Sequence, residues 1–527
     1  MLRLHLTCIL LLAASSPAQT VGGEYLILQQ WDGGSGDYHG WCVACAGDVN
    51  ADGFDDIVVN ARKYDGTAEV YSGADGSLIY RFVDPNDYSF GYSVDGAGDW
   101  NADGYDDIII GTRNEDNAFI YSGADGSLLQ YFNGGPGGNN FGHKLSGAGD
   151  VNADGYDDVI IAGYGDGFVF SGFDSTLLYR VPNANVVSST GDVNMDGYDD
   201  FLVGDLGFAY GGSNGVGTAL LHSGVDGSVI YQWYGEVPRG RFGRVGHAGD
   251  INNDTVPDIA IGAPGPDPHS SSHTGTGYIY SGADGTLLYR WPGEAGGNWM
   301  GNDVVGIGDI DGDGSNDVAI TAPWASPNGM SSAGSVYLYS GADGSLLKRL
   351  NGETSSSLFG WSANGAGDVN ADGLGDVVIG AEWALGHRGS TYVFGFKPGM
   401  TAAANEISVS AGGRVELSID FSHHAAGYSY RVLASASGVG PIHHGVDIPL
   451  GYDRLLLRSS GGFYPGAHEG GLHGTLDLNG DAVGIIRLTA GNWPELVGRS
   501  FHLAVVAMRP GSPPEISSIA VPFSFTQ

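Results

Sequence analysis

Short apolar runs alternate with polar, glycine-rich turns along most of the chain. Clear examples are residues 57–59, 108–110, 159–161 and 377–379, which contain only valine and isoleucine. Runs of this length between turn signals predict β-strands rather than helices. A second sequence motif, Tyr-Ser-Gly-Ala-Asp-Gly or a close variant, follows most of these apolar runs, as at residues 71–76. Gly-Ala-Asp-Gly between two β-rich runs predicts a hairpin.

An Asp-rich segment precedes each of these runs and recurs seven times, with 42 to 59 residues between successive starts. A period of this length indicates a repeat architecture. Each unit predicts four short strands, which in the second unit cover residues 90–94, 108–110, 118–122 and 128–132. Seven units of four antiparallel strands predict a β-propeller, and a solenoid is the alternative.

The two ends of the repeat region favour a closed ring. The seventh unit stops after its third strand, at 392–396, and residues 27–31 resemble a fourth strand such as 287–291. A strand from the N-terminus that completes the last blade would leave no free sheet edge. The predicted fold is therefore all-β: a seven-bladed β-propeller over residues 19–398, its last blade closed by the N-terminal strand.

Beyond the propeller, residues 402–527 alternate apolar and polar positions without the repeat, which predicts a small C-terminal β-sandwich. At the other end, residues 1–18 have the basic start, short apolar run and small residues of a secretory signal peptide. We therefore expect an extracellular or cell-surface protein without a membrane span. In that compartment Cys42 and Cys45 form either a local disulfide or two buried thiols.

Charge narrows the choice of partners. The chain has 22 Lys and Arg against 60 Asp and Glu, a net charge of −38. Nucleic-acid binding rests on clustered basic residues, so this balance argues against it, and against anionic membranes for the same reason. The hydrophobic content of 42% excludes a disordered chain.

The Asp-rich segments have the residue types of a calcium loop. Positions 1, 3, 5 and 9 carry Asp or Asn, position 6 is usually Gly, and position 7 offers its carbonyl. Hard oxygen ligands around a glycine-enabled turn suit Ca²⁺, whereas Mg²⁺ prefers fewer protein ligands and transition metals prefer His or Cys. The predicted ligands, with the position-7 carbonyl fourth in each set, are Asp48, Asn50, Asp52, Phe54 and Asp56; Asp99, Asn101, Asp103, Tyr105 and Asp107; Asp150, Asn152, Asp154, Tyr156 and Asp158; Asp192, Asn194, Asp196, Tyr198 and Asp200; Asp250, Asn252, Asp254, Val256 and Asp258; Asp309, Asp311, Asp313, Ser315 and Asp317; and Asp368, Asn370, Asp372, Leu374 and Asp376.

The loops differ both from helical calcium motifs and from simple turns. An EF-hand or dockerin needs an acidic residue at position 12, where this chain has Val or Ile every time. A simple turn would not gather three or four carboxylates, because their repulsion destabilises the fold unless a cation is present. We expect up to seven structural Ca²⁺ ions, one per blade. The fifth site should be the weakest because Thr255 replaces the position-6 glycine and Pro257 follows.

Two short motifs recur in the repeat region: Phe-Gly pairs occur at residues 90–91, 141–142, 242–243 and 359–360, and Gly-Ala-Pro occurs at 262–264. Together with the Asp-rich loops, they resemble the FG-GAP repeats of integrin α-subunit propellers and of their secreted bacterial relatives. The resemblance covers about residues 24–398. It implies a seven-bladed propeller, Ca²⁺ loops between the first two strands of the blades, and a role in extracellular recognition or adhesion.

The face opposite the Asp-rich loops is the expected recognition surface, because the long variable loops 205–217, 263–276 and 323–334 lie there. Aromatic residues near these loops suggest contact with an extracellular protein or glycan, although packing between blades is the alternative for them. They are Trp291, Trp299, Trp324, Trp361, Trp383 and Tyr38.

We expect a monomer without enzymatic activity. The alternative function is a carbohydrate-active propeller, either a Ca²⁺-dependent polysaccharide lyase or a glycan-binding lectin. A lyase would need a base and a cation to neutralise a uronate, and the main basic cluster of these loops is Arg239, Arg241 and Arg244.

Overall fold

A computed structural model describes residues 24–397 apart from 62–65, 85–86, 136–139, 164, 211–212, 267–272 and 371, together with the strands of the C-terminal region. The chain divides into two compact units, one of which spans Tyr25–Lys397 and the other of which includes Pro398–Gln527. The predicted leader, residues 1–18, lies outside the described residues.

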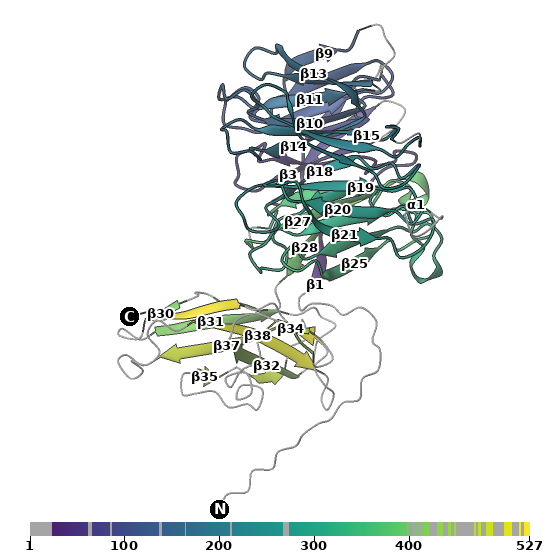
Figure 1. The fold of residues 1–527 in the computed structure, drawn as a ribbon. Helices are drawn as coiled ribbons and strands as arrows, with labels where there is room; N and C mark the ends of the chain where they lie inside the picture. Colours follow the sequence, from purple (N-terminus) through teal and green to yellow (C-terminus); the bar gives the residue numbers. More distant parts are fainter. Residues whose placement is uncertain are drawn as a thin grey trace, which may run out of the picture. The chain divides into compact units, whose positions relative to one another are not determined.

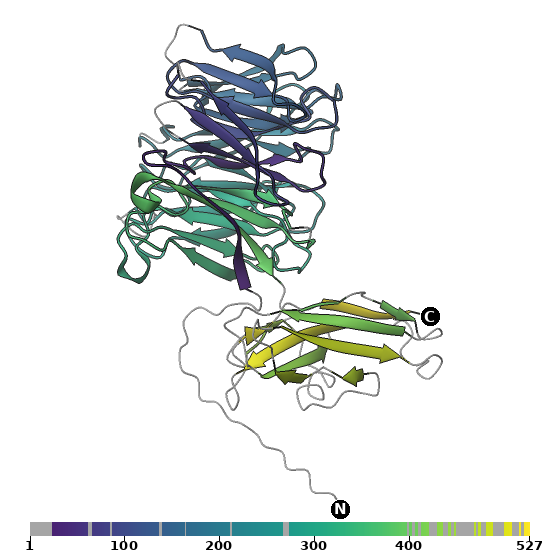
Figure 2. The same cartoon turned by 180° about the vertical axis from the view of Figure 1, so that it is seen from behind.

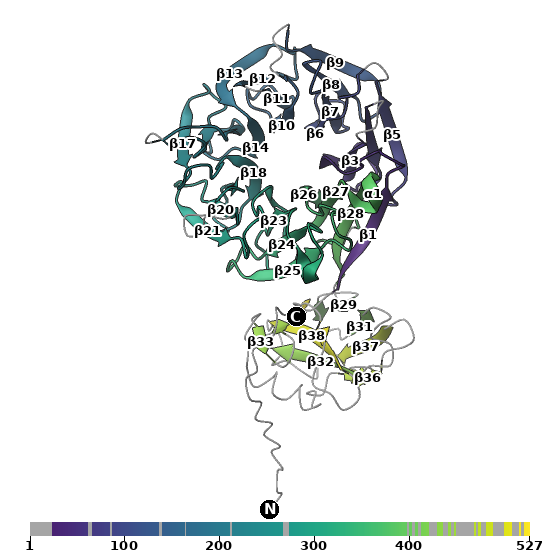
Figure 3. The same ribbon diagram turned by 90° about the vertical axis from the view of Figure 1, so that its right-hand side faces the viewer.

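Seven four-stranded antiparallel sheets make up the first unit and surround a common axis (Figure 3). This confirms the seven-bladed propeller. Blades 1 to 3 contain β2 (Val43–Gly47), β3 (Asp56–Ala61), β4 (Thr67–Tyr71) and β5 (Leu78–Val83); β6 (Ser93–Gly98), β7 (Asp107–Gly111), β8 (Asn117–Tyr121) and β9 (Leu128–Asn133); and β10 (Lys144–Gly149), β11 (Asp158–Ala162), β12 (Gly165–Phe170) and β13 (Leu177–Ala184).

The remaining blades repeat the same order from the axis outward. Blades 4 to 6 contain β14 (Val186–Gly191), β15 (Asp200–Asp205), β16 (Thr218–His222) and β17 (Val229–Tyr234); β18 (Arg244–Gly249), β19 (Asp258–Ala263), β20 (Thr276–Tyr280) and β21 (Leu287–Pro292); and β22 (Val304–Gly306), β23 (Val318–Ala322), β24 (Ser335–Tyr339) and β25 (Leu346–Asn351). Blade 7 contains β26 (Ser362–Gly367), β27 (Asp376–Ala381), β28 (Ser390–Lys397) and β1 (Glu24–Asp32). The loops of blades 6 and 7 include a 3₁₀ turn, Pro327–Gly329, and the short helix α1 (Ala384–His387).

The N-terminal strand closes the ring as predicted. In blade 7 the strand order is β26-β27-β28-β1, so β1 supplies the outermost strand next to β28. Figures 1 and 2 show this pair from opposite sides, with β1 in purple beside β28 in green. Joining the two ends of the repeat region completes blade 7 and pairs the outer edge of β28.

The core of the propeller lies between neighbouring blades. The second strand of each blade is almost wholly buried, as in β3, because a blade lies on either side of it. This explains the continuous aliphatic runs in the sequence, which buried strands show in place of alternation. Between blades 1 and 2, for example, Val58 and Val70 pack with Phe90, Ile108 and Ile110.

The first strand of each blade begins later than the sequence indicated. In blade 2 the prediction was 90–94, whereas β6 begins at Ser93. Gly91 has φ +75°, which is incompatible with an extended strand, so Phe90 and Gly91 form a turn instead. Phe90 is buried there against Phe119, with ring centroids 5.5 Å apart.

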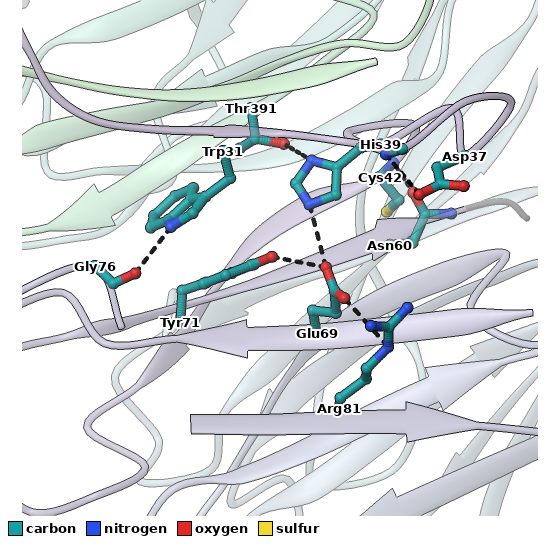
Figure 4. A network of polar contacts seen from close by, with 11 residues as sticks. Trp31, Asp37, His39, Cys42, Asn60, Glu69, Tyr71, Gly76, Arg81 and Thr391 are labelled. Atoms are coloured by element: carbon teal, nitrogen blue, oxygen red, sulfur yellow. Dashed lines mark hydrogen bonds and ion pairs between the residues drawn. The ribbon is translucent and has the colours of Figure 1, made fainter. Parts of the chain in front are cut away.

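A polar network joins blade 7 to blade 1 (Figure 4). The buried His39 places Nδ1 3.0 Å from Oγ1 of Thr391 in β28 and Nε2 3.4 Å from Oε2 of Glu69 in β4. Tyr71 donates its hydroxyl to Glu69 at 2.7 Å, and Nε of Arg81 lies 3.4 Å from the other carboxylate oxygen. Burial raises the pKa of Glu69, but the hydrogen bonds from His39 and Tyr71 outweigh it and leave that pKa below its usual value.

This network replaces an aromatic pair. In blade 2 the equivalent of His39 is Phe90 and the equivalent of Glu69 is Phe119, which faces Ile110 as Glu69 faces Val59. Blade 1, which follows the blade that closes the ring, therefore has an imidazole–carboxylate pair in place of two aromatic rings.

Cys42 and Cys45, near the start of β2, are free thiols rather than a disulfide, and both are half-buried rather than fully buried. Burial raises the pKa of Cys42, and it raises that of Cys45 to about 12.

The C-terminal region contains two larger sheets. One has the order β29 (Met400–Ala402), β31 (Gly413–Asp420), β37 (Asp481–Leu488) and β35 (His468–Gly470). The other has the order β30 (Glu406–Ser408), β40 (Val521–Thr526), β38 (Ser500–Met508), β32 (Ser429–Ser435) and β36 (His473–Thr475), with β39 (Ile516–Ser517) beside β38, and β33 (Pro441–His443) pairs with β34 (Asp447–Pro449). This agrees with an all-β region, and the sandwich packing stays a prediction.

Candidate metal centre

The Asp-rich loops connect the first and second strands of every blade. They lie at the same end of the propeller as the hairpins between the third and fourth strands, because the two are hydrogen-bonded. In blade 1 the N–H of Gly73, in the hairpin, donates to Oδ1 of Asp56, at the end of the loop, at 3.0 Å. The opposite end carries the Phe-Gly turns, and parallel bridges such as Gly334 with Phe359 join these turns to the loops between the second and third strands.

Each loop folds around its first carboxylate. In loop 1, Asp48 accepts the N–H of Asp52 at 2.9 Å on one oxygen and the N–H of Gly53 at 2.9 Å on the other. Asp52 in turn accepts the N–H of Phe54 at 3.0 Å. All seven loops repeat these three bonds, the first carboxylates of the other six being Asp99, Asp150, Asp192, Asp250, Asp309 and Asp368. Asx-type bonds of this kind explain why these residue types form the turn.

The position-9 carboxylate is fully buried in every loop and has a structural role that the sequence did not reveal. Asp158, for example, accepts the N–H of Val151 in its own loop at 2.9 Å and the N–H of Gly172 in the hairpin at 2.9 Å. The residues at this position are Asp56, Asp107, Asp158, Asp200, Asp258, Asp317 and Asp376. Each therefore lies between its own loop and the adjacent strands, where a bound ion would be held against the body of the blade.

Burial makes these carboxylates hard to ionise while they lack a cation. It raises the pKa of Asp107 to about 7, that of Asp376 to about 8 and that of Asp317 to about 9. Backbone N–H donors oppose this increase, and the other carboxylates of the same loop add to it. A divalent cation would favour the charged form of every one of them.

Orphaned oxygen atoms provide a test of whether the loops fit a cation. In loop 2, Oδ1 of Asn101 and Oδ2 of Asp107 are buried and accept no hydrogen bond from any described residue, and the same holds for Oδ1 of Asn152 in loop 3. These atoms belong to positions 3 and 9. Buried acceptors without a donor are costly in a folded protein, and a cation bound by oxygen ligands would satisfy them.

Loop 6 brings its carboxylates closest together. Asp309, Asp311 and Asp317 each offer an oxygen within 4.8 Å of the other two. Asp311 stands where the other loops have Asn, so this loop has one more carboxylate among its four predicted side-chain ligands than each of the others. The residues at positions 1, 3 and 9 of this loop fit a hard divalent ion.

The fifth loop keeps its hydrogen bonds under strain. Thr255 has φ +73°, in the region where the other six loops have glycine. Its N–H still donates to Asp250 at 2.8 Å. A β-branched residue in this conformation is strained, which agrees with the prediction that this site is the weakest. Its relative affinity for Ca²⁺ stays a prediction.

Position 8 links neighbouring loops, a role that sequence reasoning missed. Asp106 accepts the N–H of Asp48 in the preceding blade at 2.8 Å. The same bond joins Asp157 to Asp99 at 2.8 Å and Asp199 to Asp150 at 2.9 Å. The only sequence signal is the Asp-Asp pair that ends the first four loops.

Comparison with known proteins agrees with this architecture. The FG-GAP repeat profile matches residues 242–281 and 301–339. The chain carries an integrin-α-like FG-GAP propeller. It is 29% identical to integrin alpha-5 of Xenopus laevis over 180 residues and 28% identical to integrin alpha-8 of Mus musculus over 247 residues. It is also 30% identical to integrin alpha-2 of Bos taurus over 168 residues.

These alignments cover parts of both proteins. They include 31%, 43% and 29% of this chain, but only 17%, 22% and 14% of the respective integrins. The chain thus matches about a fifth or less of the length of these relatives. Neither helical segment among the described residues has the length and apolar character of a membrane span.

The aromatic residues proposed for the opposite face divide into two groups. Trp291 was wrongly assigned to that surface: it is buried in β21, donates its indole N–H to Gly344 of the next blade at 2.9 Å and stacks on Tyr339. Trp31 and Trp233 make the same inter-blade bond. The others are half-buried in loops or turns of the Phe-Gly end, namely Trp299, Trp324, Trp361, Trp383 and Tyr38.

Proposed function

We propose that this FG-GAP propeller binds Ca²⁺ in its Asp-rich loops and acts as a non-catalytic extracellular recognition or adhesion protein. The observation that carries the proposal is the repeated loop geometry. Seven loops hold the same carboxylates with the same backbone bonds, and orphaned oxygens remain at positions 3 and 9 in loop 2. The proposed ligands are those predicted from the sequence, including the position-7 carbonyls.

The ions would act as structural staples. At a free Ca²⁺ concentration ten times Kd, each independent site adds about 1.4 kcal/mol by mass action, and seven sites add about 10 kcal/mol. That is comparable to the net stability of an entire domain. Saturating seven sites would also reduce the net charge from −38 to −24.

A thermal melt with and without a chelator tests this role. We expect the unfolding midpoint to fall when EDTA removes Ca²⁺, and to return when Ca²⁺ is added in excess but not when Mg²⁺ is. An unchanged midpoint would refute the staple role.

Recognition is proposed for the end of the propeller that carries the Phe-Gly turns and the long loops. Support comes from the half-buried tryptophans at that end and from the likeness to integrin α chains. An array of extracellular proteins and glycans, probed at constant Ca²⁺, tests this assignment. A reducing-end release assay on acidic polysaccharides tests the proposed lack of catalysis.

A further inference from the structure

The seven innermost strands enclose a cavity of about 300 Å³ on the propeller axis. At its Phe-Gly end the lining comes from the residue that begins each inner strand or directly precedes it. Lys144, Val186, Arg244 and Asp303 provide it in four consecutive blades, 3 to 6. A volume of this size lies at the small end of ligand-binding pockets, so the cavity suits one small group.

Basic residues gather here although the chain is strongly acidic. Lys144 and Arg244 both line the cavity, on either side of the small Val186. Arg241 and Arg113 lie close by, since Arg241 acts electrostatically on Arg244 and the Arg113 guanidinium lies 5.2 Å from the ring centre of Tyr92. Four of the 22 basic residues of the chain therefore surround one opening.

The two basic groups of the lining are poorly compensated. Arg244 has one ion pair among the described residues, a long one of 3.8 Å to Asp303, and its buried Nε donates to none of them. Lys144 lies within 4.0 Å of no described carboxylate. An Arg side chain with free donors in a cavity is suited to a planar, two-oxygen acceptor such as a carboxylate.

Two acidic residues, Asp95 and Asp303, line the same cavity. Burial raises the pKa of Asp95 to about 7, with Ser146 and Lys144 opposing the increase, so Asp95 has only part of a negative charge near neutral pH. Burial also raises the pKa of Asp303, whereas Arg244 and Lys144 lower it. When Asp95 is protonated, Asp303 is therefore the one carboxylate of the lining that faces the two basic groups.

An aromatic rim adjoins the other half of the opening. In blades 7, 1 and 2 the residue after Phe-Gly or His-Gly is aromatic, and the residue after that lines the cavity. Trp361 and Trp41 have ring centroids 5.0 Å apart, and Trp41 and Tyr92 have theirs 5.6 Å apart. Asn302 of blade 6 donates to the carbonyl of Trp361 at 2.9 Å and holds this rim in position.

From this juxtaposition we infer that the Phe-Gly end of the axial cavity binds the terminal residue of a uronic-acid-containing polysaccharide. The uronate carboxylate pairs with Arg244 and Lys144, and the sugar ring lies against the rim of Trp361, Trp41 and Tyr92. Aromatic faces favour the partially positive C–H groups of a sugar, and the hydroxyls of Ser93 and Ser362 in the lining can meet those of the sugar. A single acidic side chain of a peptide would use the basic groups but not the rim.

This inference deepens the proposed function, because it names the ligand class of the same face. The test is isothermal titration calorimetry of the intact protein at 1 mM Ca²⁺ with hexagalacturonate as the probe. Its fully methyl-esterified form has the same sugars without charge, and hexaglutamate has the charge without sugars. We expect binding of hexagalacturonate alone, weakened at least tenfold by added salt and by methyl esterification.

Variants locate the site. Arg244→Gln and Lys144→Gln should each weaken binding about tenfold, and Trp361→Ala should weaken it several-fold. Arg180→Gln is the matched control, because Arg180 is an exposed arginine on the outer strand β13, paired with Asp166, and its loss should change Kd less than twofold. Lys144→Gln breaks no described ion pair, so it remains informative if Arg244→Gln disturbs folding.

Three results would overturn the inference: no binding of hexagalacturonate, equal binding of the methyl ester, or an unchanged Kd in Lys144→Gln. Equal binding of hexaglutamate with the same dependence on Lys144 would show an acidic-peptide site instead. The proposed function fails separately, if the intact protein binds nothing on the array or if its array ligands bind with no involvement of the Phe-Gly end.

Discussion

Replacing Asn101 with alanine separates cation binding from loop structure. The Asn101 side-chain oxygen is buried in loop 2 and accepts no hydrogen bond from the described residues. Without metal, an unsatisfied buried acceptor costs about 1–3 kcal/mol, so Asn101→Ala should leave the free energy of unfolding unchanged or raise it by up to about 1 kcal/mol. With Ca²⁺, the same change removes a ligand and should destabilise the protein.

The expected size of the Ca²⁺ effect follows from mass action. At ten times Kd the site contributes about 1.4 kcal/mol, and a tenfold weaker site contributes about 0.4 kcal/mol, a loss of about 1 kcal/mol. In a protein of this size that lowers Tm by about 1–2 °C. Differential scanning fluorimetry of wild type and variant measures both effects: an unchanged or higher Tm of the variant in EDTA and a lower one in Ca²⁺.

Asn114→Ala is the matched control, because Asn114 is an exposed asparagine in another loop of the same blade. It should change Tm little in either buffer. If Asn101→Ala lowered Tm by the same amount in EDTA and in Ca²⁺, Asn101 would be a purely structural residue and the ligand assignment at position 3 would be wrong.

Three further predictions concern pH, strain and ring closure. Burial raises the pKa of carboxylates such as Asp376, to about 8, so the metal-free protein should lose stability as pH rises from about 4 to 8. The stabilisation by Ca²⁺ should grow over the same range. A melting temperature in EDTA that does not change with pH would contradict this. Thr255→Gly should strengthen the fifth site and stabilise the Ca²⁺ form by up to about 1 kcal/mol. The reciprocal Gly197→Thr should lower the free energy of unfolding by about 1–3 kcal/mol. Negligible shifts in Ca²⁺-dependent Tm for both variants would refute the strain argument. In the network of Figure 4, His39→Phe alone should lower the free energy of unfolding in urea by about 2–4 kcal/mol. Adding Glu69→Phe should restore most of this loss, because two aromatic rings fill the same place in other blades. A double variant less stable than the single one would show that the polar network itself is required.

The repeat made most of the propeller predictable from sequence. Seven copies at regular spacing fixed the number of blades, and the likeness of residues 27–31 to an outer strand predicted the closing role of β1. Both rest on the repeat, because each copy folds into the same four-stranded unit. The start of the first strand was misplaced because Phe-Gly reads as a strand signal, whereas the positive φ of Gly91 makes it a turn.

The ligands of the candidate site were predictable from the sequence, but the hydrogen bonds that hold those ligands in place were not. Residue type and spacing identify the oxygen ligands of each loop. They do not show that Asp107 also accepts the N–H of Gly123 from a hairpin, or that Asp106 reaches the loop of the preceding blade. Those bonds join residues far apart in sequence, so they depend on the tertiary arrangement. Trp291 was misjudged for the same reason, since its partner lies in the next blade.

Equilibrium dialysis of the metal-free protein against Ca²⁺ tests the central claim most directly. The account predicts close to seven Ca²⁺ ions bound per chain at saturation, one of them weaker than the rest, and a loss of about half an ion in an Asn101→Ala variant at about three times the Kd of the wild-type sites, where a tenfold weaker site differs most in occupancy. Binding of no more than one Ca²⁺ per chain at millimolar concentration would contradict it.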